Sequence, residues 1–298
     1  MRTSSAMVTV ALLLAGCGGG SEGAAPGINI VPGAVAVAPV PAAAPAPAPE
    51  TAQGSPEDLE ALRYIKRGAA SLPPLDLSDM RLWNWGGKWH ASEWGNWMGP
   101  LPWKYDHVSK AANGDVVMKL DSGGAPQLQA MDGMPPVATG MWETEVTLPK
   151  LKDGLVVAPL WLYDAQSSDE IDFEFAGRKG LDVTMHVKVN GQMQHMSSRL
   201  FAGRDMSGER HRFGIKVDQT NGYVEMYLDG YRVHRWDRST SKGFVSRTLR
   251  PFIEMWAANP DDGGFVGWVG RWTGLADKET LTMTVHGYGY NPTGKTPI

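Results

Sequence analysis

Two-residue turn signals divide the second half of the chain into short segments of alternating polar and apolar residues. Asn190-Gly191, Asn221-Gly222 and Asp229-Gly230 each separate two such segments, and these dipeptides favour the tight turns of β-hairpins. In 183–189, Val, Met, Val and Val alternate with Thr, His and Lys. A strand with this period buries one face and exposes the other. The pattern predicts an all-β fold, and the many short strands beyond residue 75 favour a two-sheet antiparallel jelly-roll sandwich.

The N-terminal part of the chain has a different composition. A short basic start and an apolar run lead to Leu14-Ala15-Gly16-Cys17, and Ala, Pro and Gly then dominate. This order is typical of a secretory signal peptide, predicted over 1–16, followed by a Pro-rich extended tether over 17–54. The tetrad resembles the bacterial lipoprotein box, which implies that Cys17 carries a lipid. We therefore expect a protein anchored to a membrane of the bacterial cell envelope, at the outer membrane, the cell surface or in the periplasm. A plain signal peptide is the alternative.

The rest of the chain is predicted as a short helix over 55–70 and one catalytic β domain over 71–298. Ser55-Pro56-Glu57-Asp58 supplies an N-cap residue, a proline at the first helical position and acidic residues in the first turn. The formal net charge of -4 gives no basic surface for nucleic acid. The single cysteine excludes an internal disulfide and a Cys-rich zinc site. We expect a monomer.

One predicted strand, within the segment 168–177, carries three acidic residues on the same face. Glu170, Asp172 and Glu174 alternate with Ile, Phe and Phe, so the acids share one face and the apolar residues the other. A solvated acidic strand and a divalent-cation site are two interpretations of this pattern. The third is glycosidic hydrolysis, which needs one carboxylate as a nucleophile and one carboxylic acid as a proton donor.

The same segment carries a family resemblance. Asp169-Glu170-Ile171-Asp172-Phe173-Glu174-Phe175, followed by Ala176-Gly177, resembles the active-site strand of glycoside hydrolase family 16, whose pattern is Glu-x-Asp-x-Glu. The unbulged spacing is similar to that of bacterial lichenases and plant xyloglucan transglycosylases, whereas most laminarinases and agarases insert one residue. Residues 226–234 and 251–256 resemble a later hairpin and a Trp-bearing strand of the family. The resemblance covers about residues 75–290 and implies a β-jelly roll with a concave substrate cleft.

Carried over to this sequence, the resemblance implies a retaining endo-glycosidase acting on a β-linked polysaccharide. Glu170 would be the nucleophile, Glu174 the general acid and then base, and Asp172 the residue that assists the nucleophile. No cofactor is required for this chemistry. A transglycosylase of the same fold and a non-catalytic carbohydrate-binding jelly roll are the alternatives.

Aromatic residues are the predicted sugar contacts, because sugar rings pack on aromatic faces. Of the 12 tryptophans, Trp256 and then Trp161 are the first candidates, followed by Trp142 and Trp268. Six lie between Trp83 and Trp103, and we expect some of these in the core and others in a loop at the edge of the cleft.

Three positions depart from the lichenase pattern at places that contact substrate. His186 and Lys188 stand where lichenases carry Asn and Tyr, and Glu254 stands where an Asn is usual. Lys188 either binds an acidic or sulfated sugar or pairs with Glu254 or a catalytic carboxylate. The last strand, 281–286, has no evident counterpart of the Asp that binds calcium in lichenases, so a structural calcium is not supported and no metal ligand is predicted.

Overall fold

The computed structural model of the chain describes residues 80–81, 84–85, 89–130 and 136–295. The predicted signal peptide, Cys17, the tether over 17–54 and the helix over 55–70 lie outside these residues and stay predictions. Within the described residues, no helix is long and apolar enough to cross a membrane.

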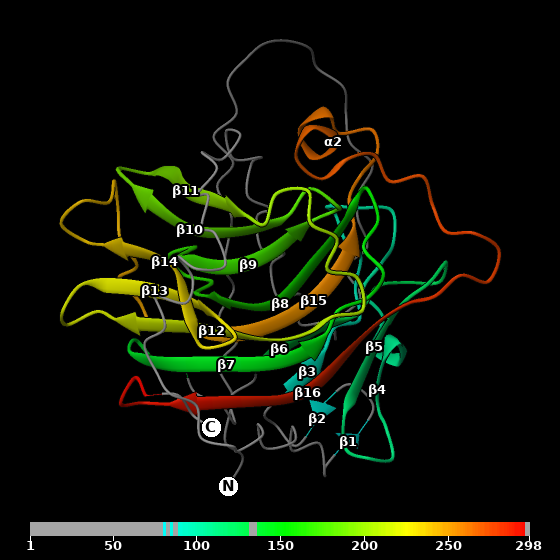
Figure 1. Cartoon of the computed structure of the whole chain (residues 1–298), viewed down its shortest axis with the longest axis horizontal. Helices are drawn as coiled ribbons and strands as arrows, with labels where there is room; N and C mark the ends of the chain where they lie inside the picture. The colour runs from blue at the N-terminus through cyan, green and yellow to red at the C-terminus, as the bar shows by residue number, and fades with distance from the viewer. Residues whose placement is uncertain (1–79, 82–83, 86–88, 131–135, 296–298) are drawn as a thin grey trace, which may run out of the picture. The chain divides into compact units, whose positions relative to one another are not determined.

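Two antiparallel sheets account for most of the described residues, which confirms the predicted jelly-roll sandwich (Figure 1). The first sheet has nine strands, in the spatial order β1 (Met80–Arg81), β2 (Asn84–Trp85), β3 (Trp89–Ala91), β6 (Gln127–Ala130), β15 (Arg250–Ala257), β8 (Leu155–Tyr163), β9 (Glu170–Ala176), β10 (Leu181–Val189) and β11 (Gln192–Leu200). The second has seven: β14 (Tyr231–Asp237), β13 (Tyr223–Leu228), β12 (Arg210–Asp218), β7 (Gly140–Thr147), β16 (Leu281–Asn291), β5 (Val116–Leu120) and β4 (Val108–Lys110). Two short helices complete the described elements: η1 (Tyr105–His107) and α2 (Gly263–Val269).

The hydrophobic core lies between the two sheets and is built from alternate residues of their strands. On β9, Ile171, Phe173 and Phe175 are almost completely buried. The rings of Phe173 and Phe175 contact Phe213 of β12 edge-on, with centroids 5.4 and 6.0 Å apart, a favourable aromatic geometry. The three acidic residues of β9 therefore lie on the face of the first sheet that points away from the core, called the carboxylate face below.

The three predicted hairpins are confirmed, and one has a longer turn than expected. Asn190-Gly191 joins β10 to β11 and Asp229-Gly230 joins β13 to β14, with positive φ at all four residues, as a two-residue hairpin turn requires. The third hairpin uses loop 219–222 between β12 and β13, in which Gly222 has a φ of 73°. The β10–β11 turn matters for the site because it fixes the register between β10, which neighbours β9, and β11.

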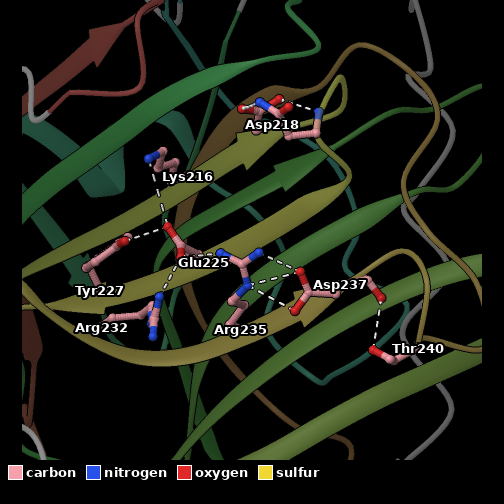
Figure 2. Close-up of polar contacts among 9 residues, drawn as sticks. Lys216, Asp218, Glu225, Tyr227, Arg232, Arg235, Asp237 and Thr240 are labelled. Atoms are coloured by element: carbon pink, nitrogen blue, oxygen red, sulfur yellow. Dashed lines mark hydrogen bonds and ion pairs between the residues drawn. The ribbon is translucent and has the colours of Figure 1, made fainter. Parts of the chain in front are cut away.

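The opposite face of the molecule carries a network of ion pairs around one buried carboxylate (Figure 2). Glu225 of β13 accepts hydrogen bonds from the Tyr227 hydroxyl at 2.6 Å, from Arg232 at 2.8 Å and from Arg235 at 2.7 Å, and the Lys216 ammonium lies 3.9 Å away. Burial raises the pKa of Glu225, but the hydrogen bonds from Tyr227, Arg235 and Arg232 outweigh it and hold the pKa below its ordinary value. On this face of the second sheet, the negative charge of Glu225 is therefore balanced by the cations around it.

Helix α2 was not predicted from the sequence. Its N-terminus is capped by Asp262, whose carboxylate accepts from the backbone N–H groups of Gly264 and Phe265. At its other end, the Val269 carbonyl accepts from the backbone N–H of Gly154, next to the start of β8, at 2.8 Å. The helix is thereby held at one end of the carboxylate face.

Candidate active site

The pairing of β9 with its two neighbours gives each acidic residue a different set of partners. Side chains directly opposite each other on adjacent strands are in contact range. The rows across β8, β9, β10 and β11 are Tyr163–Glu170–His186–His195, Trp161–Asp172–Thr184–Ser197 and, on the last three strands alone, Glu174–Asp182–Arg199. Glu170 thus lies beside a histidine and Glu174 beside a second acid.

The centre of the carboxylate face is a buried pair between Asp172 and His186. Nε2 of His186 lies 2.9 Å from Oδ2 of Asp172, and both side chains are almost fully buried. Burial lowers the pKa of His186, but the charge and hydrogen bond of Asp172 and the charge of Glu170 outweigh it and raise the pKa above its ordinary value. Burial likewise raises the pKa of Asp172, against the opposite effect of His186. The sequence-based prediction placed His186 at the substrate, whereas the structure places it between the carboxylates.

Glu170, Asp172 and His186 each bring one potential ligand atom within 4.8 Å of the others. This spacing would suit a small cation. Asp172 and His186, however, are already paired with each other, and we do not assign these residues as metal ligands.

The two glutamates of β9 are in different electrostatic surroundings. Burial raises the pKa of Glu170 to about 8; the charge of His186 acts against this increase, and Asp172 adds to it. Burial raises the pKa of Glu174 well above its ordinary value, and the charges of Asp172, Glu170 and Asp182 all add to the increase. A positive charge favours the ionised form of a carboxyl group and a negative charge disfavours it. Glu170 therefore loses its proton before Glu174 does.

Asp182 beside Glu174 is held by two partners that the sequence did not indicate. Arg199 of β11 donates two hydrogen bonds to the Asp182 carboxylate, at 2.8 and 2.7 Å. The indole N–H of Trp268 in α2 donates to the same carboxylate at 2.7 Å. Helix α2 is thereby connected to the strand that neighbours Glu174, and Trp268, the fourth predicted aromatic contact, lies at this end of the carboxylate face.

Glu254 of β15 is a further buried carboxyl group on this face. Its Oε2 accepts from Nε2 of Gln127 at 2.5 Å, and Oε1 of Gln127 in turn accepts from the Ser92 hydroxyl at 2.5 Å. Burial raises the pKa of Glu254 to about 7, while Gln127 and the nearby Trp161 and Trp256 act in the opposite direction. With 4% of its surface exposed, Glu254 is covered by its protein neighbours.

The predicted aromatic contacts fall in two different places. Trp161 lies opposite Asp172 and stacks on Phe252 of β15, with ring centroids 4.3 Å apart. Trp256 lies two residues from Glu254 on β15 and packs against α2. Trp142, in contrast, is in the core, with its ring 5.0 Å from that of Tyr290. The structure corrects the prediction that Trp142 contacts substrate, because β7 belongs to the second sheet and points this side chain inward.

Lys188 is at the end of the carboxylate face and is exposed to solvent. Its ammonium group donates to the Ser168 hydroxyl at 3.0 Å, just before β9 begins. Among the described contacts, Lys188 bonds to Ser168 and pairs neither with Glu254 nor with a catalytic carboxylate. A contact of Lys188 with an acidic sugar stays a prediction.

The tryptophan cluster near the start of the described residues divides between core and surface, and a place at the edge of the cleft stays a prediction. Trp89 and Trp103 are buried in the core, Trp94 is half-buried, and Trp97 is 49% exposed. Trp83 lies outside the described residues.

Comparisons with known proteins agree with this architecture. Residues 87–273 match the sequence model of glycosyl hydrolases family 16. A comparison with curated proteins finds no match. Among solved structures, the β-glucanase of Bacillus licheniformis is 17% identical, with a TM-score of 0.57 over 75% of this chain and 99% of that one.

Two further solved structures are similar. The GH16 protein of a Bacteroides ovatus mixed-linkage glucan locus, in complex with its product, is 15% identical, with a TM-score of 0.55 over 72% of this chain and 98% of that chain. Crh5 transglycosylase is 20% identical, with a TM-score of 0.50 over 77% and 86% of the two chains. The structural likeness concerns the fold, and the family match covers more than half of the sequence. The chain therefore belongs to glycosyl hydrolases family 16.

Proposed function

We propose that the chain is a retaining, endo-acting glycoside hydrolase that cleaves internal β-linkages of a polysaccharide. Glu170 is the nucleophile, Glu174 is the general acid and then the general base, and Asp172 assists Glu170. Membership of family 16 and the placement of the three acids side by side on β9 support this proposal. No cofactor takes part in it.

The observation that carries the proposal is the difference between the two glutamates. A double displacement needs one ionised carboxylate and one protonated carboxylic acid at the same pH. Glu170 is beside His186, whose positive charge favours the ionised form. Glu174 is surrounded by other acids, which favour its protonated form. The different neighbours of the two glutamates thus support a nucleophile at Glu170 and an acid at Glu174.

The reaction follows in two steps. The Glu170 carboxylate attacks the anomeric carbon, and the glycosidic bond breaks as Glu174 gives its proton to the leaving sugar oxygen. An ester then joins the sugar to Glu170. A water molecule attacks the same carbon, Glu174 takes the proton of that water, and the ester bond breaks to restore the Glu170 carboxylate. Two inversions at one carbon leave the configuration unchanged.

A neutral β-glucan is the substrate class that we favour. The solved structures that are similar to this chain include a β-glucanase and a protein of a mixed-linkage glucan locus. Five carboxyl groups that are buried or half-buried lie on this face, and Arg199 is engaged with Asp182, so an acidic chain would meet repulsion there. Exposed Lys188 is the feature that favours an acidic polysaccharide as the second candidate.

Transglycosylation is the other reaction that this site could carry out. Crh5, which has a similar fold, is named a transglycosylase. A sugar hydroxyl would then replace water in the second step, with Glu170 and Glu174 in the same roles. Product analysis in the presence of an oligosaccharide acceptor separates the two reactions, because only transglycosylation gives products longer than the substrate.

The experiment that tests the proposal combines substrate screening with three variants. Release of reducing ends is measured on lichenan, laminarin, xyloglucan, agarose, carrageenan and an acidic exopolysaccharide, and proton NMR of the first product identifies its anomer. We expect a β-anomer first, loss of activity in Glu170→Gln, and a decrease of about 10²–10⁴-fold in Glu174→Gln. Glu279→Gln, a carboxylate remote from β9 that bonds to Lys152, is the matched control. Unchanged cleavage by Glu170→Gln would refute the proposal. That result is expected if the chain is a non-catalytic binding domain and another enzyme in the preparation cleaves the substrate.

A further inference from the structure

A second histidine, which the proposed function does not use, is hydrogen-bonded to the first. His195 of β11 lies directly opposite His186 of β10. The two Nδ1 atoms are 2.5 Å apart, and the rings meet edge to face with centroids separated by 4.8 Å. Together with the contact between Nε2 of His186 and Asp172, this forms a continuous chain across three strands, from Asp172 through His186 to His195.

The Nδ1–Nδ1 contact leaves room for one proton only. Imidazole nitrogens are donors when protonated and acceptors when not, so one ring must donate and the other must accept. His186 lies between the carboxyl groups of Glu170 and Asp172, which favour a positive charge on it. Burial, together with the charge of His186, lowers the pKa of His195 to about 4. These surroundings favour a positively charged His186 whose Nε2–H faces the Asp172 carboxylate and whose Nδ1–H is accepted by a neutral His195.

We propose that His195 is a positioning residue for the catalytic carboxylates, because it accepts the Nδ1 proton of His186 and so holds His186 as a cation whose Nε2–H faces Asp172. The inference rests on the proposed function of Glu170 and Asp172. His195 acts through His186 and takes no part in bond making or breaking.

Few other groups compete for this contact among the described residues. β11 is the last strand of its sheet, so β10 is the strand that packs beside His195. The titratable residues on the same side of β10 are His186, Lys188 and Asp182; Lys188 bonds to Ser168 and Asp182 is engaged with Arg199. His186 therefore has its charge set by Asp172 and Glu170 on one side and by His195 on the other.

The position of His195 explains how the nucleophile of a buried site can ionise. Without a cation, burial and the neighbouring acids would keep Glu170 protonated. A cationic His186 favours the ionised form of Glu170. His186 stays cationic only as long as its Nδ1–H has an acceptor, because a buried N–H of a charged group without an acceptor costs free energy. His195 provides that acceptor from the edge of the sheet.

Three variants of the full-length protein test the proposal. His195→Leu removes the acceptor at Nδ1 of His186. His195→Gln restores one, because a glutamine side chain carries a carbonyl oxygen. Ser197→Ala is the matched control: it removes a cross-strand hydrogen bond between the same two strands, from Ser197 to Thr184 at 2.9 Å, without touching His186. Thermal unfolding of each variant shows which of them fold.

The first readout does not depend on activity. Nitrogen-15 NMR of the histidine side chains reports the protonation state and the pKa of His186, and the 7 histidines of the chain are assigned by substitution. Loss of a hydrogen bond to a charged group disfavours the charged form, so we expect the pKa of His186 to fall by about one to two units in His195→Leu. It should stay near the wild-type value in His195→Gln and Ser197→Ala. A wild-type His186 that is neutral at pH 6, or whose pKa is unchanged in His195→Leu, would overturn the proposal.

The second readout is the pH dependence of kcat/KM. A neutral His186 no longer favours the Glu170 carboxylate, so the acid limb should move to higher pH in His195→Leu by about one unit and return in His195→Gln. A uniform loss of activity with an unchanged acid limb would indicate a structural role and overturn the proposal. The outcomes also separate the two levels of inference: cleavage that persists in Glu170→Gln refutes the proposed function, whereas the NMR result concerns His195 alone.

Discussion

Replacing Glu254 by glutamine should stabilise the protein, and the effect should depend on pH. Glu254 is 4% exposed, bonds to Gln127 through one oxygen, and has no cation among the contacts that the structure describes. Glutamine has the same shape, and its carbonyl oxygen can still accept the Gln127 hydrogen bond. The substitution therefore removes the ability to ionise and leaves the packing against Trp161 and Trp256 in place.

The magnitude follows from the difference between the folded and unfolded pKa values. Burial raises the pKa of Glu254 from 4.5 to about 7. Between these two pH values the folded protein holds a proton that the unfolded chain has released, so folding becomes less favourable as pH rises. The stability contributed by the protonated group is present below pH 4.5 and is lost as pH increases through about 7. The full loss is about 3 kcal/mol, since one pKa unit corresponds to about 1.4 kcal/mol.

The assay is urea unfolding of the wild type and of Glu254→Gln at pH 4 and at pH 9. The charge of Glu254 also raises the pKa values of Glu170 and Glu174, so its removal relieves repulsion at pH 9 and adds to the difference in the same direction. We expect equal stability within about 1 kcal/mol at pH 4 and a variant more stable by about 3 kcal/mol at pH 9, or about 6–12 °C in Tm for a domain of this size.

Glu279→Gln serves as a control of opposite sign. A hydrogen bond from Lys152 lowers the pKa of Glu279, so its contribution to stability is present above the unfolded pKa and lost as pH falls. This variant should be less stable than the wild type at pH 9 and equal to it in acid. If Glu254→Gln is no more stable than the wild type at pH 9, the reasoning that an unpaired buried carboxylate opposes folding at this position is wrong.

Substitutions at Glu225 on the second sheet and at Arg199 beside Asp182 lead to two further predictions. Glu225→Leu leaves Lys216, Arg232 and Arg235 without their shared carboxylate (Figure 2); we expect a loss of about 3 kcal/mol in urea unfolding, and a loss below about 1 kcal/mol would contradict a structural role for the network. Arg199→Leu leaves the Asp182 charge beside Glu174 without its strongest partner. This should raise the pKa of Glu174 further and move the basic limb of kcat/KM to higher pH by about one unit, whereas a shift to lower pH would contradict the proposed role of Glu174 as the acid.

The features that the sequence predicted correctly depend on local spacing. Alternation over 170–176 separates acidic from apolar residues within one strand, because successive side chains point to opposite faces. The turn dipeptides Asn190-Gly191 and Asp229-Gly230 impose a backbone shape that does not require distant partners. These two signals were enough for the sandwich, for the shared face of Glu170, Asp172 and Glu174, and for the two hairpins with two-residue turns.

The contacts that the sequence did not indicate come from the pairing of strands that are distant along the chain. Gln127 meets Glu254 because β6 pairs with β15, and no local pattern predicts that pairing. Trp142 and Trp161 are both tryptophans in apolar strands, and only the assignment of their strands to different sheets places one in the core and the other beside Asp172.

The contacts of strand β11 also depend on strand pairing, here with its neighbour in the same hairpin. Residues 192–199 are half-buried or exposed on both faces, so their alternation does not show which of them face the acids. The turn at 190–191 fixes the register, and the register pairs His195 with His186 and Arg199 with Asp182. The two-residue turn at 190–191, extended along both strands, is therefore enough to pair these residues from the sequence.

The outer faces of the two sheets shift the pKa values of their carboxyl groups in opposite directions. On the second sheet, Glu225 is surrounded by Lys216, Arg232 and Arg235, and its pKa is lowered, so this face is most stable when the carboxylate is ionised. On the first sheet, burial raises the pKa values of Glu170 and Glu174, and only Glu170 has a cationic neighbour. A cationic side chain beside Glu174 would stabilise the folded protein at high pH, but it would also favour the ionised form of Glu174, the proposed proton donor. A face that keeps Glu174 protonated must therefore lose stability as pH rises, and that loss is the physical counterpart of its proposed acid chemistry.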